Sequence, residues 1–272
     1  NSYQPGFKIG LGMDLGHDDW STFAEYVWFR SSTSTHVTAP ADPRTGTPIL
    51  SVQPWLLAAT TGGLVNAGAL SSKWRLNMDL VDLGLTRPFY QGTHLIVSPF
   101  GSFRGQFIRQ KLILTATDMF HSTATAASAT STNKSHSWAV GPRAGCLAKW
   151  HLGWGFRFEG DVAGSILYTR YTKVSFNHTN VLLANAALPD NAAQFKEYNC
   201  LRAVNEMNMG LGWGSYLDCR AYHLDFLVSY DFQIFWNQNM LRQLTDVTLV
   251  RSSHASSNLY LQGLTVKAQF DF

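Results

Sequence analysis

The sequence predicts an all-β protein, an antiparallel transmembrane β-barrel of the bacterial outer membrane, from three observations. The final segment, residues 259–272, alternates strictly between apolar and polar side chains and ends on the aromatic residue Phe272. Such alternation is expected of a strand with lipid on one face and water on the other. Charged residues make up 14% of the chain, whereas ordinary soluble domains have roughly 25%. No run of about eighteen apolar residues occurs, so transmembrane helices are excluded.

Two alternating segments open the chain. Residues 7–14 and 20–28 each place large apolar side chains at every second position, and Gly16–Asp19 between them is a turn, so they form a hairpin. A third strand, 72–86, begins with four apolar residues on its lipid face and then changes phase, so that Val81, Leu83 and Leu85 face lipid. We therefore expect a β-bulge near the last of the first four, which are Trp74, Leu76, Met78 and Leu80.

Six further segments repeat the alternation. They are residues 93–112, 136–152, 154–173, 197–213, 215–236 and 259–272. Pro99 lies on the predicted lipid face of the first and lacks a backbone donor, so we expect a local irregularity there. In the segment 215–236, eight large apolar residues share one face, and this face needs lipid to cover it.

Short connectors alternate with long ones. Outer-membrane barrels keep short turns on the periplasmic side and long loops outside. The short turns lie near residues 16–19, 87–92, 153 and 214, and the long loops near 31–71, 118–135, 174–195 and 237–258. The first long loop is partly apolar, so it either folds into the mouth of the barrel or packs against a neighbouring chain.

Nine strands make up one barrel domain, residues 1–272. If Phe272 ends in the periplasm, the alternating connectors place Asn1 on the outer side of the membrane. An exported barrel is expected to begin on the periplasmic side. We therefore expect the sequence to lack a signal peptide and at least one N-terminal strand, and the complete barrel to have about ten strands.

Charged residues of both signs occupy the predicted lumen face. Either they pair across the lumen and close it, or they line a narrow aqueous path with weak ion selectivity, because a barrel of about ten strands is narrow. The predicted pore-lining residues are Lys8, Glu25, Arg75, Asp79, Arg104, Arg143, Lys149, Arg157, Glu159, Asp161, Arg202, Glu206, His223, Asp225, Asp231 and Lys267.

Catalytic and metal-binding motifs are absent from the sequence, so we expect no enzyme, no cofactor and no metal site. The best polar cluster, His223, Asp225, Ser229 and Asp231, is interpreted as a lumen wall, because alternate residues of a strand lie roughly 6 to 7 Å apart. Three cysteines, Cys146, Cys200 and Cys219, have no metal-site spacing; they are either plain strand residues or sites of intermolecular crosslinks. The net charge of +3 is dispersed, which argues against a nucleic-acid partner.

An ordered series of segments resembles the Legionella-type major outer membrane protein family, which includes porins of chlamydia-related bacteria. The segments are Pro5–Gly12, His17–Trp20, Tyr26–Phe29, Asp82–Gly84, Phe89–Tyr90, Gly141–Gly145, Tyr222–Leu224, Phe235–Asn239 and Leu261–Thr265. The resemblance implies an outer-membrane, porin-like barrel with surface-exposed loops and a role in adhesion to host cells, and it implies no catalytic residues.

Two functions follow as hypotheses. The first is a porin-like channel for ions or small hydrophilic solutes; the alternative is a structural or adhesive surface protein with a closed lumen. The expected partners are membrane lipids and lipopolysaccharide, the solutes or ions themselves, a host-cell surface and a second copy of the chain.

Overall fold

A computed structural model describes residues 3–16, 18–40, 50–52, 65–121, 124–182, 191–195, 197–217, 222–241 and 256–271. All regular elements in these ranges are strands, as the alternation predicted. They are β1 (Gly6–Asp14), β2 (Ser21–Thr38), β3 (Leu50–Val52), β4 (Val65–Thr86), β5 (Tyr90–Gln91), β6 (Leu95–His121), β7 (Ala124–Gly153), β8 (Phe156–Leu182), β9 (Asn191–Phe195), β10 (Tyr198–Leu217), β11 (Tyr222–Asn239) and β12 (Ser257–Asp271).

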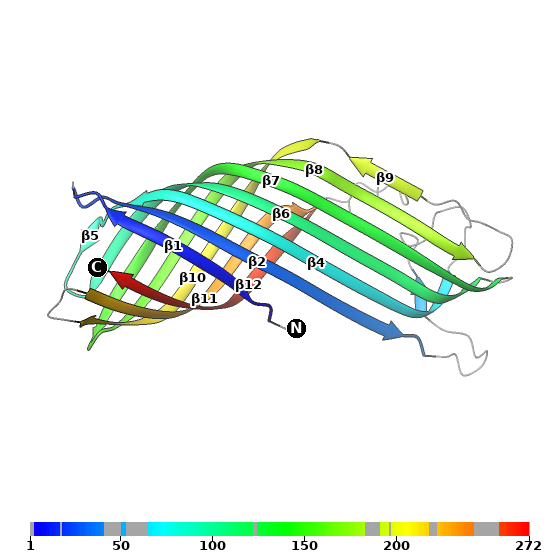
Figure 1. The fold of residues 1–272 in the computed structure, drawn as a ribbon, viewed down its shortest axis with the longest axis horizontal. Helices are drawn as coiled ribbons and strands as arrows, with labels where there is room; N and C mark the ends of the chain where they lie inside the picture. Colours follow the sequence, from blue (N-terminus) through cyan, green and yellow to red (C-terminus); the bar gives the residue numbers. More distant parts are fainter. Residues whose placement is uncertain are drawn as a thin grey trace.

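The long strands form one antiparallel sheet in the order β1-β2-β4-β6-β7-β8-β10-β11-β12, with β3, β5 and β9 as short additions. Figure 1 shows this sheet curling around an interior, so that β1, β2 and β4 slope one way across the view and β10, β11 and β12 slope the other. Among the described residues β1 and β12 do not pair with each other, so the sheet has two free edges. The described residues therefore form an open, curled antiparallel sheet.

Alternate residues separate the sheet into an inner and an outer face. Along β8, Arg157, Glu159 and Leu167 are buried on the inner face, whereas Val162 and Ile166 on the outer face expose 53% and 61% of their surface. An exposed outer face of this apolar character fits contact with lipid, because exposing so much apolar surface to water is unfavourable. The orientation predicted for the segments on β6, β7, β8, β10 and β11 is confirmed in the same way.

The orientation predicted for the first half of the third strand is wrong. β4 pairs with β2 and β6 in a continuous register through Leu80, so the expected β-bulge is absent and the predicted phase change is wrong. Trp74, Leu76, Met78 and Leu80 point inward with Asp82, and Arg75 and Asp79 consequently lie on the outer face rather than in the lumen. The pattern misled because the interior itself contains apolar side chains, so an apolar residue on a strand does not always face lipid.

Three smaller expectations also differ from the structure. The turn predicted near residue 214 lies inside β10, where Gly214 pairs with Asp225 on β11, and β10 continues to Leu217. The register of β6 on β7 runs through Pro99 without a shift, although the pairing of β4 with β6 ends beside it, at Phe100. The predicted loop 118–135 is largely a hairpin, since β6 continues to His121 and β7 starts at Ala124. Its Thr residues favour strand structure, and Ser131, Asn133 and Ser135 are buried on the inner face. Parts of the other three long loops lie outside the described residues.

Candidate pore interior

A buried ion pair links two neighbouring strands. Asp82 on β4 lies opposite Arg104 on β6, and the Arg104 guanidinium donates from Nε to Oδ1 over 2.8 Å and from Nη2 to Oδ2 over 2.6 Å. The side chains of Arg104 and Asp82 are only 2% and 1% exposed. This two-bond geometry satisfies both charges at once, which a buried pair requires.

Glu206 on β10 connects that pair to the opposite wall. Its Oε2 accepts hydrogen bonds from Arg143 Nη2 at 2.7 Å and Arg143 Nε at 3.0 Å, and it also contacts Arg104. β6 and β10 are separated in the sheet by β7 and β8, so these contacts cross the interior. The Arg143 guanidinium also lies 4.8 Å from the centre of the Phe100 ring. Four charged side chains therefore form one network, the central charge network: Asp82, Arg104, Arg143 and Glu206.

A second cluster lies nearer the short turns. Arg157 on β8 donates to Glu159 over 3.0 Å and to Asp225 on β11 over 2.6 Å. Near the edges of the sheet, Lys8 and Glu25 form an ion pair of 2.9 Å, and Asp231 contacts Asn208 and Thr265. Most inward charges thus have a partner of opposite sign or a polar neighbour.

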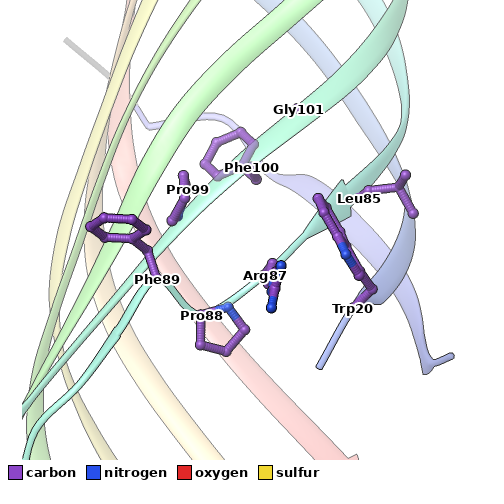
Figure 2. Close-up of a pocket in the computed structure, with 8 residues that line it drawn as sticks. All are labelled: Trp20, Leu85, Arg87, Pro88, Phe89, Pro99, Phe100 and Gly101. Carbon is purple, nitrogen blue, oxygen red and sulfur yellow. The ribbon is translucent and has the colours of Figure 1, made fainter. Parts of the chain in front are cut away.

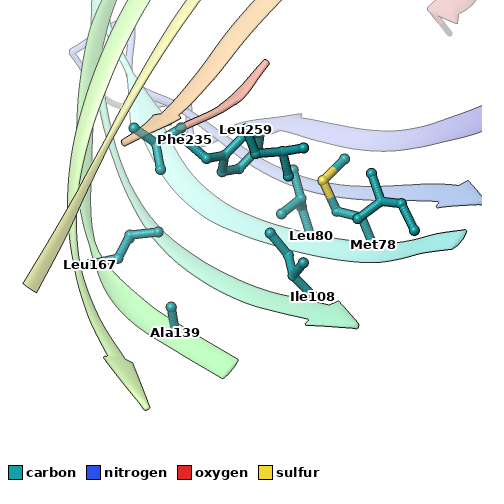
Figure 3. Close-up of a cluster of buried hydrophobic side chains, with 9 residues drawn as sticks. Met78, Leu80, Ile108, Ala139, Leu167, Phe235 and Leu259 are labelled. Atoms are coloured by element: carbon teal, nitrogen blue, oxygen red, sulfur yellow. The ribbon is translucent and has the colours of Figure 1, made fainter. Parts of the chain in front are cut away.

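An apolar layer lies beside these charges, on the side of the long loops. It consists of buried residues from β4, β6, β7, β8, β10, β11 and β12, packed against Val27 and Phe29 of β2, and none of the buried residues exposes more than 5% of its surface. Figure 3 shows these side chains converging on the interior from the different strands. The layer comprises Leu76, Met78, Leu80, Ile108, Ala139, Leu167, Val204, Phe235 and Leu259. At this level apolar side chains from seven strands pack against one another in the interior.

The predicted pore-lining residues divide into three groups. Arg202 lies inward beyond the apolar layer, with its guanidinium 5.8 Å from the Tyr171 ring and Nη2 3.6 Å from Met240 Sδ. Arg75 and Asp79 are on the outer face, as corrected above. The remaining residues are on the inner face, on the side of the short turns: Lys8, Glu25, Arg104, Arg143, Lys149, Arg157, Glu159, Asp161, Glu206, His223, Asp225, Asp231 and Lys267.

Sequence reasoning missed the apolar layer. The available signal was the recurrence of Ile108, Leu167 and Phe235 at positions whose parity is that of the polar lumen residues. Each follows the inward charges of its strand on the loop side, so the layer was visible as an interruption of the polar face.

The polar cluster on β11 is not assembled for catalysis. His223 Nδ1 lies 3.2 Å from Asp271 Oδ2, whereas Asp225 pairs with Arg157 and Ser229 accepts from Asn208. Among the described residues, no group of three or more His, Cys, Asp or Glu side chains is placed to hold a metal ion. Cys146 and Cys200 have free thiols, and Cys219 lies outside the described residues.

A recess of about 470 Å³ lies at the rim where the short turns are. Figure 2 shows its walls, in which Trp20 and Phe89 flank Arg87 and Pro88. The Arg87 guanidinium stacks 5.8 Å from the centre of the Trp20 ring. An aromatic rim of this kind fits the interface between lipid and water rather than the lumen.

The arrangement so far is an antiparallel sheet with an apolar outer face and a charged inner face. The model of one protein family, described as Legionella pneumophila major outer membrane protein precursor, matches residues 1–272, the whole chain. The chain belongs to this family. No curated protein and no solved structure gives a match. As a member of the Legionella major outer membrane protein family, the protein is located in the bacterial outer membrane, and the family is a class of outer-membrane proteins rather than of enzymes.

Within the part of the chain that the structure describes, there is no helix with the length and apolar character needed to cross a membrane.

Proposed function

We propose that this member of the Legionella major outer membrane protein family is a porin-type channel of narrow bore for small ions. One observation carries the proposal: the inner face of the curled sheet holds charges of both signs, whereas the outer face at the same height is apolar. Charges inside a polypeptide shell are costly unless they are paired or serve a passing ion. Rings of charged side chains are one way in which channels select ions.

The apolar layer sets the expected conductance. Because its residues are buried against one another, an ion that follows the interior must pass a stretch lined by apolar side chains. Hydrophobic constrictions gate channels by wetting and dewetting. The channel is therefore expected to have short open times and a small single-channel conductance, and not to act as a wide diffusion pore.

Single-channel recording in planar bilayers, with the natural full-length protein, tests this. Leu80→Ser makes the apolar layer more polar and should raise the open probability. Leu83→Ser is the matched control, because Leu83 is three residues away on the same strand and points outward with 59% exposure. If neither wild type nor the Leu80→Ser variant conducts while both remain folded, the channel proposal fails.

A second function, a surface protein with a closed lumen, is favoured by the same layer. Its members are almost fully buried, and the central charge network pairs two cations with two anions. In that case the function resides in the long loops, and loop deletions should remove binding to host cells without unfolding the sheet.

Closure of the sheet is also a proposal. The edges β1 and β12 are separated by eight antiparallel steps, so they run in the same direction and could only pair directly as parallel strands. We propose that one further strand, antiparallel to both, lies between them and completes a barrel of about ten strands, an even number as in bacterial single-chain barrels.

A further inference from the structure

The outer face carries a cluster of basic side chains that the channel proposal does not use. We name it the basic outer patch; its members come from β4, β6, β7 and β8. They are Lys73, Arg75, Arg109, Lys111, Lys134, His136 and Lys173. The register sets them side by side: Arg75 lies opposite Lys111, and Lys111 opposite Lys134. Directly opposed like charges destabilise a sheet, so this arrangement needs a compensating anion.

No carboxylate in the described part of the chain supplies that compensation. Two described carboxylates of the outer face are already engaged, since Asp79 pairs with Arg30 at 2.8 Å and Glu197 pairs with Arg170 at 2.8 Å. Among the residues that the structure describes, none of the basic outer patch forms an ion pair. Within the described residues, the basic outer patch therefore presents uncompensated positive charge on the outer face.

The height of the patch indicates what that partner is. On β7, the outward positions from Trp150 to Trp138 carry no charge, and the first basic side chain follows at His136. Residues 138–150 of a strand tilted by about 40° span roughly 30 Å along the membrane normal, the thickness of a hydrocarbon core. The patch thus lies at the headgroup level, on the side of the β6–β7 hairpin.

A shallow recess continues the patch toward the loops. It measures about 380 Å³, and Lys73 joins it to the patch. Residues from three strands line it, and the alternation of the strands turns the side chains of Ser34 and His36 on β2, Ser71 on β4 and Thr115 on β6 outward, beside Lys73. Hydroxyls beside a cation suit a phosphorylated sugar, because the cation binds phosphate and the hydroxyls bind ring oxygens.

We propose that the basic outer patch and this recess bind the phosphorylated disaccharide headgroup of an outer-leaflet glycolipid. The acyl chains of such a lipid extend along the apolar face directly below, where Phe103 and Phe107 are 62% and 52% exposed. A soluble polyanion would bind the charges but leave that apolar face uncovered. The assignment to the outer leaflet rests on the proposed barrel orientation, with the long loops outside.

The test compares binding of the full-length protein, in detergent micelles, to added diphosphorylated lipid A. The double variant Arg75→Gln, Lys111→Gln should bind about thirtyfold more weakly, because each basic group near an anionic surface contributes about fivefold. Arg87→Gln is the matched control, since Arg87 is an outer-face residue at the opposite rim. The Arg87→Gln variant should bind lipid A with the affinity of wild type.

Three outcomes overturn the proposal. They are unchanged affinity of the double variant, an equal loss in Arg87→Gln, and a preference of the patch for a soluble sulfated polysaccharide over lipid A. A second double variant, Arg75→Lys with Lys111→Arg, keeps the charges and should restore binding, which separates a lost site from a misfolded sheet. Conductance is recorded on the same variants and should stay at the wild-type level, so failure of the lipid site and failure of the channel are distinguishable.

Discussion

The central charge network should respond sharply to loss of one carboxylate. Glu206→Gln keeps the size of the side chain but removes the charge that holds Arg143 and contacts Arg104. Arg104 retains Asp82, whereas Arg143 loses its described ion-pair partner and is left with a neutral amide oxygen at position 206 and its contact with the Phe100 ring. Because Arg143 is 10% exposed and Glu206 8%, water replaces little of the lost interaction.

Removing one partner of a buried ion pair typically lowers the free energy of unfolding by about 3–5 kcal/mol. The matched control is Glu197→Gln, which breaks the pair with Arg170 on the outer face, where the side chains are 66% and 38% exposed. An exposed pair contributes about 1 kcal/mol or less. We therefore expect a clear loss of stability for Glu206→Gln and nearly none for Glu197→Gln.

Urea unfolding of the two variants in lipid vesicles, followed by tryptophan fluorescence and heat-modifiable gel mobility, measures the difference. Equal unfolding midpoints and slopes for Glu206→Gln and wild type would refute the reasoning, because the contacts that cross from β6 and β7 to β10 would then contribute nothing.

Three other predictions concern the interior and the edges of the sheet. Arg143→Glu leaves Arg104 as the one cation of the central charge network, so reversal potentials under a salt gradient should shift toward cation preference; an unchanged potential would place the ion path elsewhere. Gly141→Ala should lower the free energy of unfolding by about 1–3 kcal/mol, because an added Cβ would lie 2.2 Å from the Ile166 carbonyl oxygen. Gly164→Ala is the control: no atom lies within 4 Å of its added Cβ, so the same urea titration should show no change. Cysteine placed at Leu11 on β1 should form no disulfide with cysteines placed along 260–268 on β12 in the full-length protein, since an intervening strand separates the edges by about 9.6 Å; rapid oxidation of any such pair would contradict the proposed closure.

The alternation of side chains predicted most of the sheet because each strand separates two different surroundings. On β8 the polar residues Arg157, Glu159 and Ser165 face inward and Phe158, Val162 and Ile166 face outward, as period two requires. The pairing of the first two strands followed from the short turn between them, because a tight connection joins antiparallel neighbours.

β4 marks the limit of that reasoning. Trp74, Leu76, Met78 and Leu80 have the composition of a lipid face, yet neighbouring strands also send apolar residues inward at this level. One strand taken alone cannot distinguish the two surroundings, because both are apolar. Only the register across strands resolves it, since Leu80 lies opposite Val27 and Met78 opposite Phe29.

The ion pairs of the central charge network could not be predicted from the sequence for a related reason. Inward parity identified Arg104, Arg143 and Glu206 as members of one face, but their contacts join strands that are not neighbours in the sheet. Such contacts depend on how strongly the sheet curls. Alternation carries no information about curvature.

The most direct test of the apolar layer is the accessibility of spin labels placed singly at residues 76 to 85 of β4 in lipid vesicles. Oxygen, which concentrates in lipid, and a water-soluble nickel reagent serve as relaxing agents. The structure predicts labels at Val81, Leu83 and Leu85 that oxygen reaches, and labels at Leu76, Met78 and Leu80 that neither agent reaches. Strong oxygen accessibility at Leu76, Met78 and Leu80 would place these side chains in lipid and contradict the account.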